Sequence, residues 1–141
     1  MERLCATPLI DKLGVRPGAR VVVVGVDDAD FRRLLDERTG DVTVLADSDR
    51  LPDAVDAIFL GADSVAELAR LATLREALVP NGAVWVVSRK GKAAPIRDVD
   101  VIEAAKPAGL VDNKVASFSA THTALRLVIP RALRRHEAGA R

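Results

Sequence analysis

The stretch 21–33, VVVVGVDDADFRR, joins an apolar run to a polar segment with a helical pattern, and one glycine separates the two. A continuous β-branched run is typical of a strand covered on both faces, so residues 20–25 predict a buried parallel strand. Residues 29–38 predict a helix, which Thr39 and Gly40 close. A strand that passes through glycine into a helix is also how a nucleotide-binding loop begins, so this stretch raises the question of a cofactor site.

The alternation of apolar strands and helical segments continues along the chain. Further strands are predicted at 42–46, 57–60, 83–87, 111–119 and 123–129, and further helices just before Gly14, at 64–78 and at 99–106. The connection 120–122 is so short that it can join only antiparallel neighbours. The sequence therefore predicts a three-layer α/β fold of the Rossmann type, with a mostly parallel sheet of about six strands that ends in an antiparallel hairpin.

Composition limits the classes of function. Of the 141 residues, 49% are hydrophobic and 29% are charged, which is typical of a folded domain, and we expect one domain over 1–130 with a flexible basic tail at 131–141. The net charge of +1 and the few aromatic residues argue against nucleic acid as a partner. Without an apolar run long enough for a membrane span, and with Cys5 as the one cysteine, we expect a cytoplasmic protein with no membrane contact.

In the order of its elements the chain resembles the class I S-adenosylmethionine-dependent methyltransferases, whose sheet ends in such a hairpin. The resemblance covers about 13–130 and lies in three stretches, LGVRPGARVVVVG (13–25), DAIFLG (56–61) and ALVPNGAVWVV (77–87). GLVDNKVASFS (109–119) and the short chain are more similar to a family of short bacterial domains of unknown function with a reduced version of this fold. The reduced topology implies a strand order of second, first, third, fourth, sixth and fifth.

The resemblance implies a glycine-rich cofactor loop after the first strand, but only Gly25 of its glycines is present. Asp27 and Ala29 stand at the later glycine positions, and Val23 stands where the family carries an acidic residue. The carboxylates of Asp27 and Asp28 would also repel the cofactor's carboxylate, by about 1 kcal/mol at about 4 Å in water. A simpler explanation of these aspartates is that one caps the following helix and the others favour its N-terminal end.

Two features nevertheless keep a cofactor site open. Asp47 stands close to the position where the family holds the ribose hydroxyls, although an aspartate in a surface turn is the alternative. Gly61 shares the predicted crevice with Gly25. If the site is functional, its cofactor-binding residues are therefore Gly25, Asp27, Asp47 and Gly61. The segment 50–55 is too short for the family's usual third strand and helix, which weakens the cofactor hypothesis.

The remaining polar residues show no catalytic or metal-binding pattern. Arg89, Lys90 and Lys92 follow the fourth strand at the edge where α/β sheets bind ligands, so they could hold an anionic metabolite, and a solvated loop is the alternative. His122 in the hairpin connection has no evident partner for a role as general base. The two histidines are not at metal-ligand spacing with Cys5, so we expect no metal.

The lost glycine loop favours a methyltransferase-like domain that is not an enzyme, holds no cofactor, and acts in interaction or regulation with an unidentified protein partner. The alternative is a small S-adenosylmethionine-dependent methyltransferase with an altered loop. The predicted edge strand 42–46, VTVLA, carries no charge or proline that would discourage pairing with another chain. A homodimer through this strand is therefore a further expectation, with cover by segment 49–54 or by the N-terminal helix as the alternative.

Overall fold

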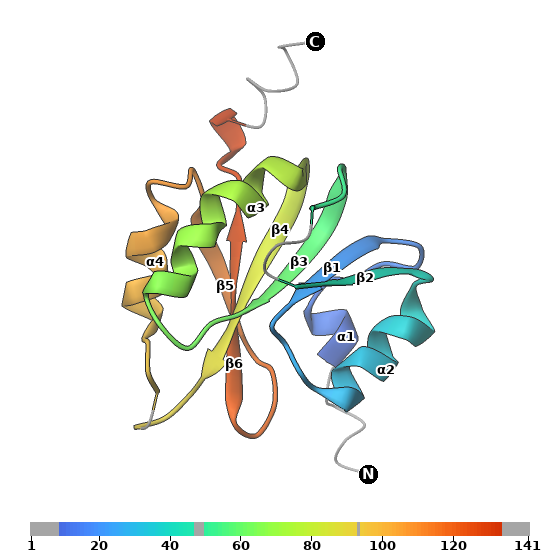
Figure 1. The fold of residues 1–141 in the computed structure, drawn as a ribbon, viewed down its shortest axis with the longest axis horizontal. Helices are drawn as coiled ribbons and strands as arrows, with labels where there is room; N and C mark the ends of the chain where they lie inside the picture. The colour runs from blue at the N-terminus through green and yellow to red at the C-terminus, as the bar shows by residue number, and fades with distance from the viewer. Residues whose placement is uncertain (1–8, 47–49, 93, 134–141) are drawn as a thin grey trace.

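The computed structural model of the chain describes residues 9–46, 50–92 and 94–133. Its strands are β1 (Arg20–Val24), β2 (Asp41–Leu45), β3 (Val55–Gly61), β4 (Leu78–Arg89), β5 (Val111–Ser117) and β6 (His122–Val128). They form one sheet in the order β2-β1-β3-β4-β6-β5, in which the first four are parallel and β6 and β5 are antiparallel (Figure 1). The predicted strand order and the closing hairpin are confirmed.

Helices cover both faces of this sheet (Figure 1). One face packs against α1 (Leu9–Lys12) and α2 (Ala29–Arg38), and the other packs against the 3₁₀-helix η2 (Ala66–Arg70), α3 (Leu71–Ala77) and α4 (Asp98–Ala105). Successive strand residues point to opposite faces, so the apolar run of β1 supplies both cores. The result is the predicted three-layer α/β fold.

The face under α2 is packed with aromatic side chains. The ring of Phe31, from α2, meets the rings of Phe59 and Phe118 edge to face, with centroids 4.8 Å apart in both pairs. Phe59 is in turn stacked on Trp85, with centroids 6.4 Å apart. All four side chains are buried, so α2 is anchored to the sheet immediately after the loop that follows β1.

The helix predicted at 64–78 is wrong in its first half, which is a 3₁₀-helix. The backbone N–H groups of Glu67 and Leu68 donate to carbonyls three residues earlier, over 3.2 and 3.0 Å, and Ser64 Oγ also accepts from Glu67 N. Such tight turns are frequent where an α-helix begins, and their apolar spacing is close to that of an α-helix. Val65, expected on the apolar face, is exposed.

The turn predicted at 79–82 lies inside β4. Leu78 already pairs with Val55 of β3, and regular pairing resumes where Ala83 faces Ala57. The intervening residues form an irregularity in the ladder rather than a break between two elements. The strand therefore begins directly at the end of α3, and its last residues reach the carboxyl edge of the sheet.

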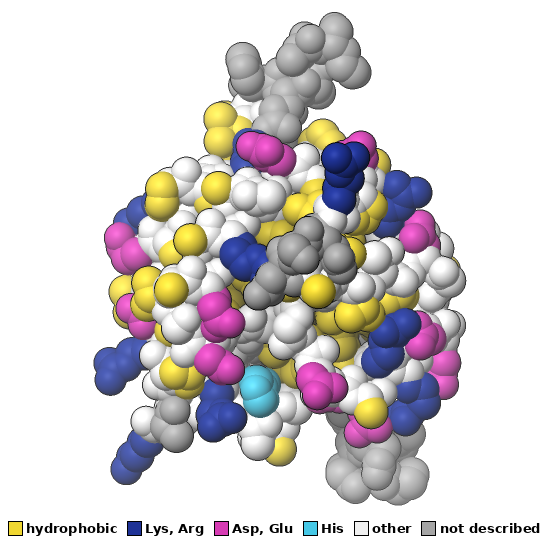
Figure 2. Space-filling model, viewed as in Figure 1, with side chains coloured by type: hydrophobic (Ala, Val, Ile, Leu, Met, Phe, Trp, Pro, Cys, Tyr) yellow, Lys and Arg dark blue, Asp and Glu magenta, His cyan; other side chains and the backbone are white. Residues whose placement is uncertain are grey.

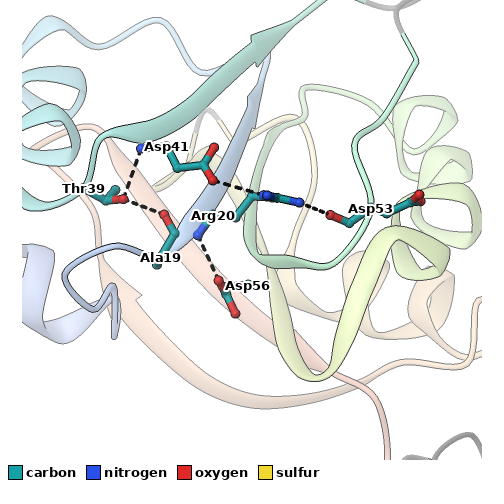
Figure 3. A network of polar contacts seen from close by, with 6 residues as sticks. All are labelled: Ala19, Arg20, Thr39, Asp41, Asp53 and Asp56. Atoms are coloured by element: carbon teal, nitrogen blue, oxygen red, sulfur yellow. Dashed lines mark hydrogen bonds and ion pairs between the residues drawn. The ribbon is translucent and has the colours of Figure 1, made fainter.

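Arg20 ties together the amino ends of three strands (Figure 3). Its Nε donates to Oδ2 of Asp41 over 3.1 Å, and its Nη1 donates to the carbonyl oxygen of Asp53 over 2.7 Å. Its backbone N–H donates to Oδ2 of Asp56 over 2.8 Å. These contacts lie at the amino edge of the sheet, opposite to the end where parallel sheets bind ligands. A hollow of about 290 Å³ lies beside them, lined by residues 14–19 and by Asp56, Ala57, Asn81 and Arg126.

Several predicted features lie outside the described residues. They are the start of the N-terminal helix, Cys5, Asp47 and the tail from residue 134 onward. Residues 131–133 form a helical turn, in which Leu133 N donates to the carbonyl oxygen of Pro130 over 2.9 Å. In the part of the chain that is described, no helix has the length and apolar character needed to cross a bilayer.

Candidate functional site

Gly25 and Gly61 meet at the carboxyl ends of β1 and β3. Gly25 has φ +75°, a left-handed conformation that turns the chain out of the sheet and that other residues adopt rarely. A Cβ added at Gly61 would overlap the carbonyl oxygen of Gly25 and lie 2.8 Å from its carbonyl carbon. A Cβ at Gly25 would lie 3.3 Å from the carbonyl oxygen of Gly61. Contact between two backbones therefore requires both glycines.

A small hollow lies above this contact. Its volume is about 150 Å³, below the roughly 300 Å³ at which small-molecule sites begin. A second hollow, of about 260 Å³, lies on the α2 side of the segment 26–28 and is lined partly by Val23, Phe31, Arg32 and Val44. The segment 26–28 lines both hollows and so separates them. The crevice beside Gly25 is thus divided into two hollows, of which Gly25 and Gly61 line the smaller one and Asp27 lines both. The cofactor site predicted there stays a prediction.

The smaller hollow is acidic. Its lining includes the acidic residues Asp27, Asp28, Asp63 and Glu67, and among the described residues that line it His122 is the one basic residue. Figure 2 shows acidic side chains (magenta) on both sides of the histidine (cyan) on this face of the molecule. The hollow therefore favours cationic groups over anionic ones.

Two of these carboxylates already have structural partners. Oδ1 of Asp28 accepts the backbone N–H of Phe31 over 2.9 Å, which confirms that an aspartate caps this helix. Oε1 of Glu67 accepts the backbone N–H of Asp63 over 2.6 Å. Among the described residues, no hydrogen bond or ion pair engages the side chains of Asp27 and Asp63. These two carboxylates are therefore free to meet a ligand.

His122 is held by the hairpin that it begins. Its Nδ1 lies 2.7 Å from Oγ1 of Thr121, and its backbone N–H donates to Oγ of Ser119 over 3.1 Å. Its carbonyl oxygen accepts from the backbone N–H groups of Phe118 and Ser119. The ring is half-buried at the rim of the hollow, so its position is fixed by the turn rather than by an acidic partner.

The basic residues predicted to hold an anion, Arg89, Lys90 and Lys92, lie elsewhere on this edge. Arg89 ends β4, opposite His122 of β6. Lys90 donates from Nζ to Oγ of Ser117 over 2.9 Å, and Lys92 is exposed. None of the three lines the hollow at Gly25. The anion site predicted from these residues stays a prediction, separate from the glycine contact.

The sequence reasoning missed Asp63 and Glu67. Asp63 lies two residues after the end of β3, and Glu67 lies in the first turn of η2, the next helix. Residues after parallel strands gather at the carboxyl edge, so the strand-end rule could have identified them. Across the described residues there is no group of three or more His, Cys, Asp or Glu side chains that could hold a metal ion.

Several solved structures that are similar to this chain in fold are methyltransferases. An S-adenosylmethionine-dependent methyltransferase from Aquifex aeolicus matches with a TM-score of 0.68 and 16% identity, over 86% of this chain and 87% of that one. A putative type 11 methyltransferase from Sulfolobus solfataricus matches with a TM-score of 0.64 and 16% identity, over 86% and 89%. The O-methyltransferase NcsB1 of neocarzinostatin biosynthesis, in complex with S-adenosyl-L-homocysteine and 1,4-dihydroxy-2-naphthoic acid, matches with a TM-score of 0.62 and 17% identity, over 78% and 49%.

The fold is therefore that of the class I S-adenosylmethionine-dependent methyltransferases. Residues 10–131 match the family described as "Protein of unknown function (DUF3052)", and the chain belongs to that family. No curated protein matches the chain. The predicted membership of a family of unknown function with a methyltransferase-like fold is confirmed.

Proposed function

We propose that this domain is not a methyltransferase and acts in interaction or regulation, with no S-adenosylmethionine in its crevice. The contact between Gly25 and Gly61 is the observation that carries the proposal. In this fold a glycine after the first strand lets the backbone come close to the cofactor. In this chain, Gly25 instead lets its backbone pack against the backbone of Gly61. The later glycine positions of the family's loop are occupied by Asp27 and Ala29.

The size and charge of the hollow support the same proposal. At about 150 Å³ it is too small for a nucleoside with an amino acid attached, unless the segment 26–28 moves and joins it to the second hollow. Its carboxylates repel the cofactor's own carboxylate. In the described part of the chain, no basic side chain other than His122 lines it to offset this repulsion.

Thermal unfolding with added cofactor tests the proposal. A ligand present at about 100 times its Kd stabilises a protein by about 2.7 kcal/mol, which raises the Tm by several degrees for a domain of this size. We expect no change in Tm with millimolar S-adenosylmethionine or S-adenosylhomocysteine. A concentration-dependent rise with either compound would contradict the proposal.

The acidic lining supports a second candidate function, a small methyltransferase with an altered loop. S-adenosylmethionine carries a sulfonium and an ammonium group, and the free carboxylates of Asp27 and Asp63 could attract both. This alternative requires that the sulfonium compound bind more tightly than S-adenosylhomocysteine, and that Asp27→Asn and Asp63→Asn weaken binding. Asp98→Asn, at an exposed position of α4, is the matched control. Equal affinities in all variants would remove this alternative.

A further inference from the structure

The two edges of the sheet differ in how they are protected from pairing with another chain. Within the described residues, β2 pairs only with β1, so alternate residues of β2 direct their N–H and C=O groups outward. Its central side chains, Val42, Thr43 and Val44, carry no charge, and Val44 is 54% exposed. The opposite edge, β5, contains Asp112 and Lys114 with a register shift between them. Charges and bulges of that kind discourage edge pairing, and β2 has neither at its centre.

We propose that β2 pairs antiparallel with β2 of a second copy of this chain, about a two-fold axis through Thr43. In this register Val42 faces Val44 of the partner subunit, and the reverse contact follows by symmetry. Both valines lie on the α2 face of the sheet, because they stand beside Val21 and Val23 of β1. The exposed apolar surface of one strand is thus covered by the same surface of the other.

Helix α2 carries a positive and a negative side chain that the same two-fold axis would pair with the opposite charges of the second copy. It lies along the side of the molecule where β2 forms the edge, and basic and acidic side chains alternate along that side (Figures 1 and 2). Arg32 lines a hollow together with Val44, and its Nε lies 3.1 Å from Oδ1 of Asp36. Both charged side chains are about half exposed, with 46% and 53% of their surface accessible. They are therefore available to a neighbouring molecule.

The spacing along helix and strand is nearly equal. Arg32 and Asp36 are four residues apart, about 6 Å along a helix, and Val44 and Val42 are two residues apart, about 6.7 Å along a strand. An axis that exchanges the two valines between copies therefore also brings Arg32 near Asp36 of the partner subunit. Each copy contributes one positive and one negative group, so the interface is complementary to itself and closes as a dimer.

The sequence offered two segments of the chain itself that could cover the edge of β2, namely 49–54 and the N-terminal helix. The described residues of both segments pack elsewhere. Asp53 is held by Arg20 at the amino end of the sheet, and Leu51 packs against the core on the α3 face. Helix α1 packs against the core under β1 and β3. Among the described residues, no other strand pairs with the outer edge of β2, and the proposal assigns that edge to a second copy. The inference does not depend on whether the crevice at Gly25 binds a cofactor.

Light scattering on wild-type protein and two lysine variants tests the dimer. The wild type should have twice the chain mass of 15.0 kDa, and Thr43→Lys should weaken the dimer at least about tenfold, because two lysines would face each other across the axis. Val115→Lys, at a 56% exposed position of the opposite edge strand β5, is the matched control and should remain dimeric. A wild type that is monomeric at millimolar concentration would overturn the proposal, as would an equal response of the two variants.

Charge exchange on α2 tests the register without touching the strand. Asp36→Arg alone places only positive groups across the axis and should shift the equilibrium towards monomer. Adding Arg32→Asp restores a complementary pair within and between the copies and should restore the dimer. A dimer unaffected by Asp36→Arg, or not recovered in the double variant, would overturn the proposed axis. Circular dichroism confirms that each variant is folded.

Discussion

The carbonyl oxygen of Gly25 lies against Gly61 so closely that no Cβ fits between the ends of β1 and β3. The fold is shared with methyltransferases, but at its usual ligand edge the backbones of β1 and β3 are in direct contact. The glycine that a nucleotide-binding loop would offer to its ligand is used here for internal packing. We expect the stability of the chain to depend on this contact, and we propose that its response to cofactor does too.

Gly61→Ala should destabilise the protein by about 1–3 kcal/mol, because the added methyl group meets backbone atoms that cannot rotate away. Gly40→Ala is the matched control, since nothing lies within 4 Å of a Cβ at that position and its φ is not left-handed. Urea unfolding of the two variants measures the difference. Equal midpoints would show that the contact is looser than described.

Asp28→Ala should lower the free energy of unfolding by about 1 kcal/mol, because it removes the acceptor for the backbone N–H of Phe31 at the start of α2. The neighbouring Asp27→Ala removes a carboxylate with no hydrogen-bond partner among the described residues and should change stability by only a few tenths of that amount. Thermal denaturation of both variants compares them. A larger effect at Asp27 would be inconsistent with Asp28 as the cap.

Thr39→Val should destabilise by about 1–3 kcal/mol. The buried Oγ1 of Thr39 donates to the carbonyl oxygen of Ala19 over 2.6 Å and accepts from the backbone N–H of Asp41 over 3.2 Å (Figure 3), and valine leaves both groups without this partner. Thr73→Val, at an exposed position of α3, is the control and should be close to neutral. A wild-type unfolding curve for Thr39→Val would show that water satisfies both groups.

The sequence was sufficient for those parts of the fold that local chemistry decides. Helix α2 has the predicted bounds, Ala29–Arg38, because the residues that cap it, Asp28 and Thr39, stand directly before and after it in the chain. The start of β4 could not be predicted in the same way, since it depends on the pairing of Leu78 with Val55, which are distant in sequence. The 3₁₀ form of η2 was missed because its apolar spacing also fits an α-helix.

The candidate site was predictable in position but not in shape. Gly25 and Gly61 were both expected at the ligand edge, because each follows an apolar strand. Their direct contact is decided by how closely β1 and β3 approach, which neither stretch encodes alone. Asp63 and Glu67 make the hollow acidic, and they lie within seven residues of the end of β3, at Gly61, so the rule that predicted the edge could also have found them.

Isothermal titration calorimetry with S-adenosylhomocysteine tests the central claim most directly, since this compound is the product that working methyltransferases of this fold release and it lacks the sulfonium charge. Because we propose that the Gly25–Gly61 contact and the acidic hollow leave it no site, we predict no heat of binding up to millimolar ligand, for wild type and for Asp27→Asn alike. Saturable one-to-one binding with a Kd in the low micromolar range would contradict the account.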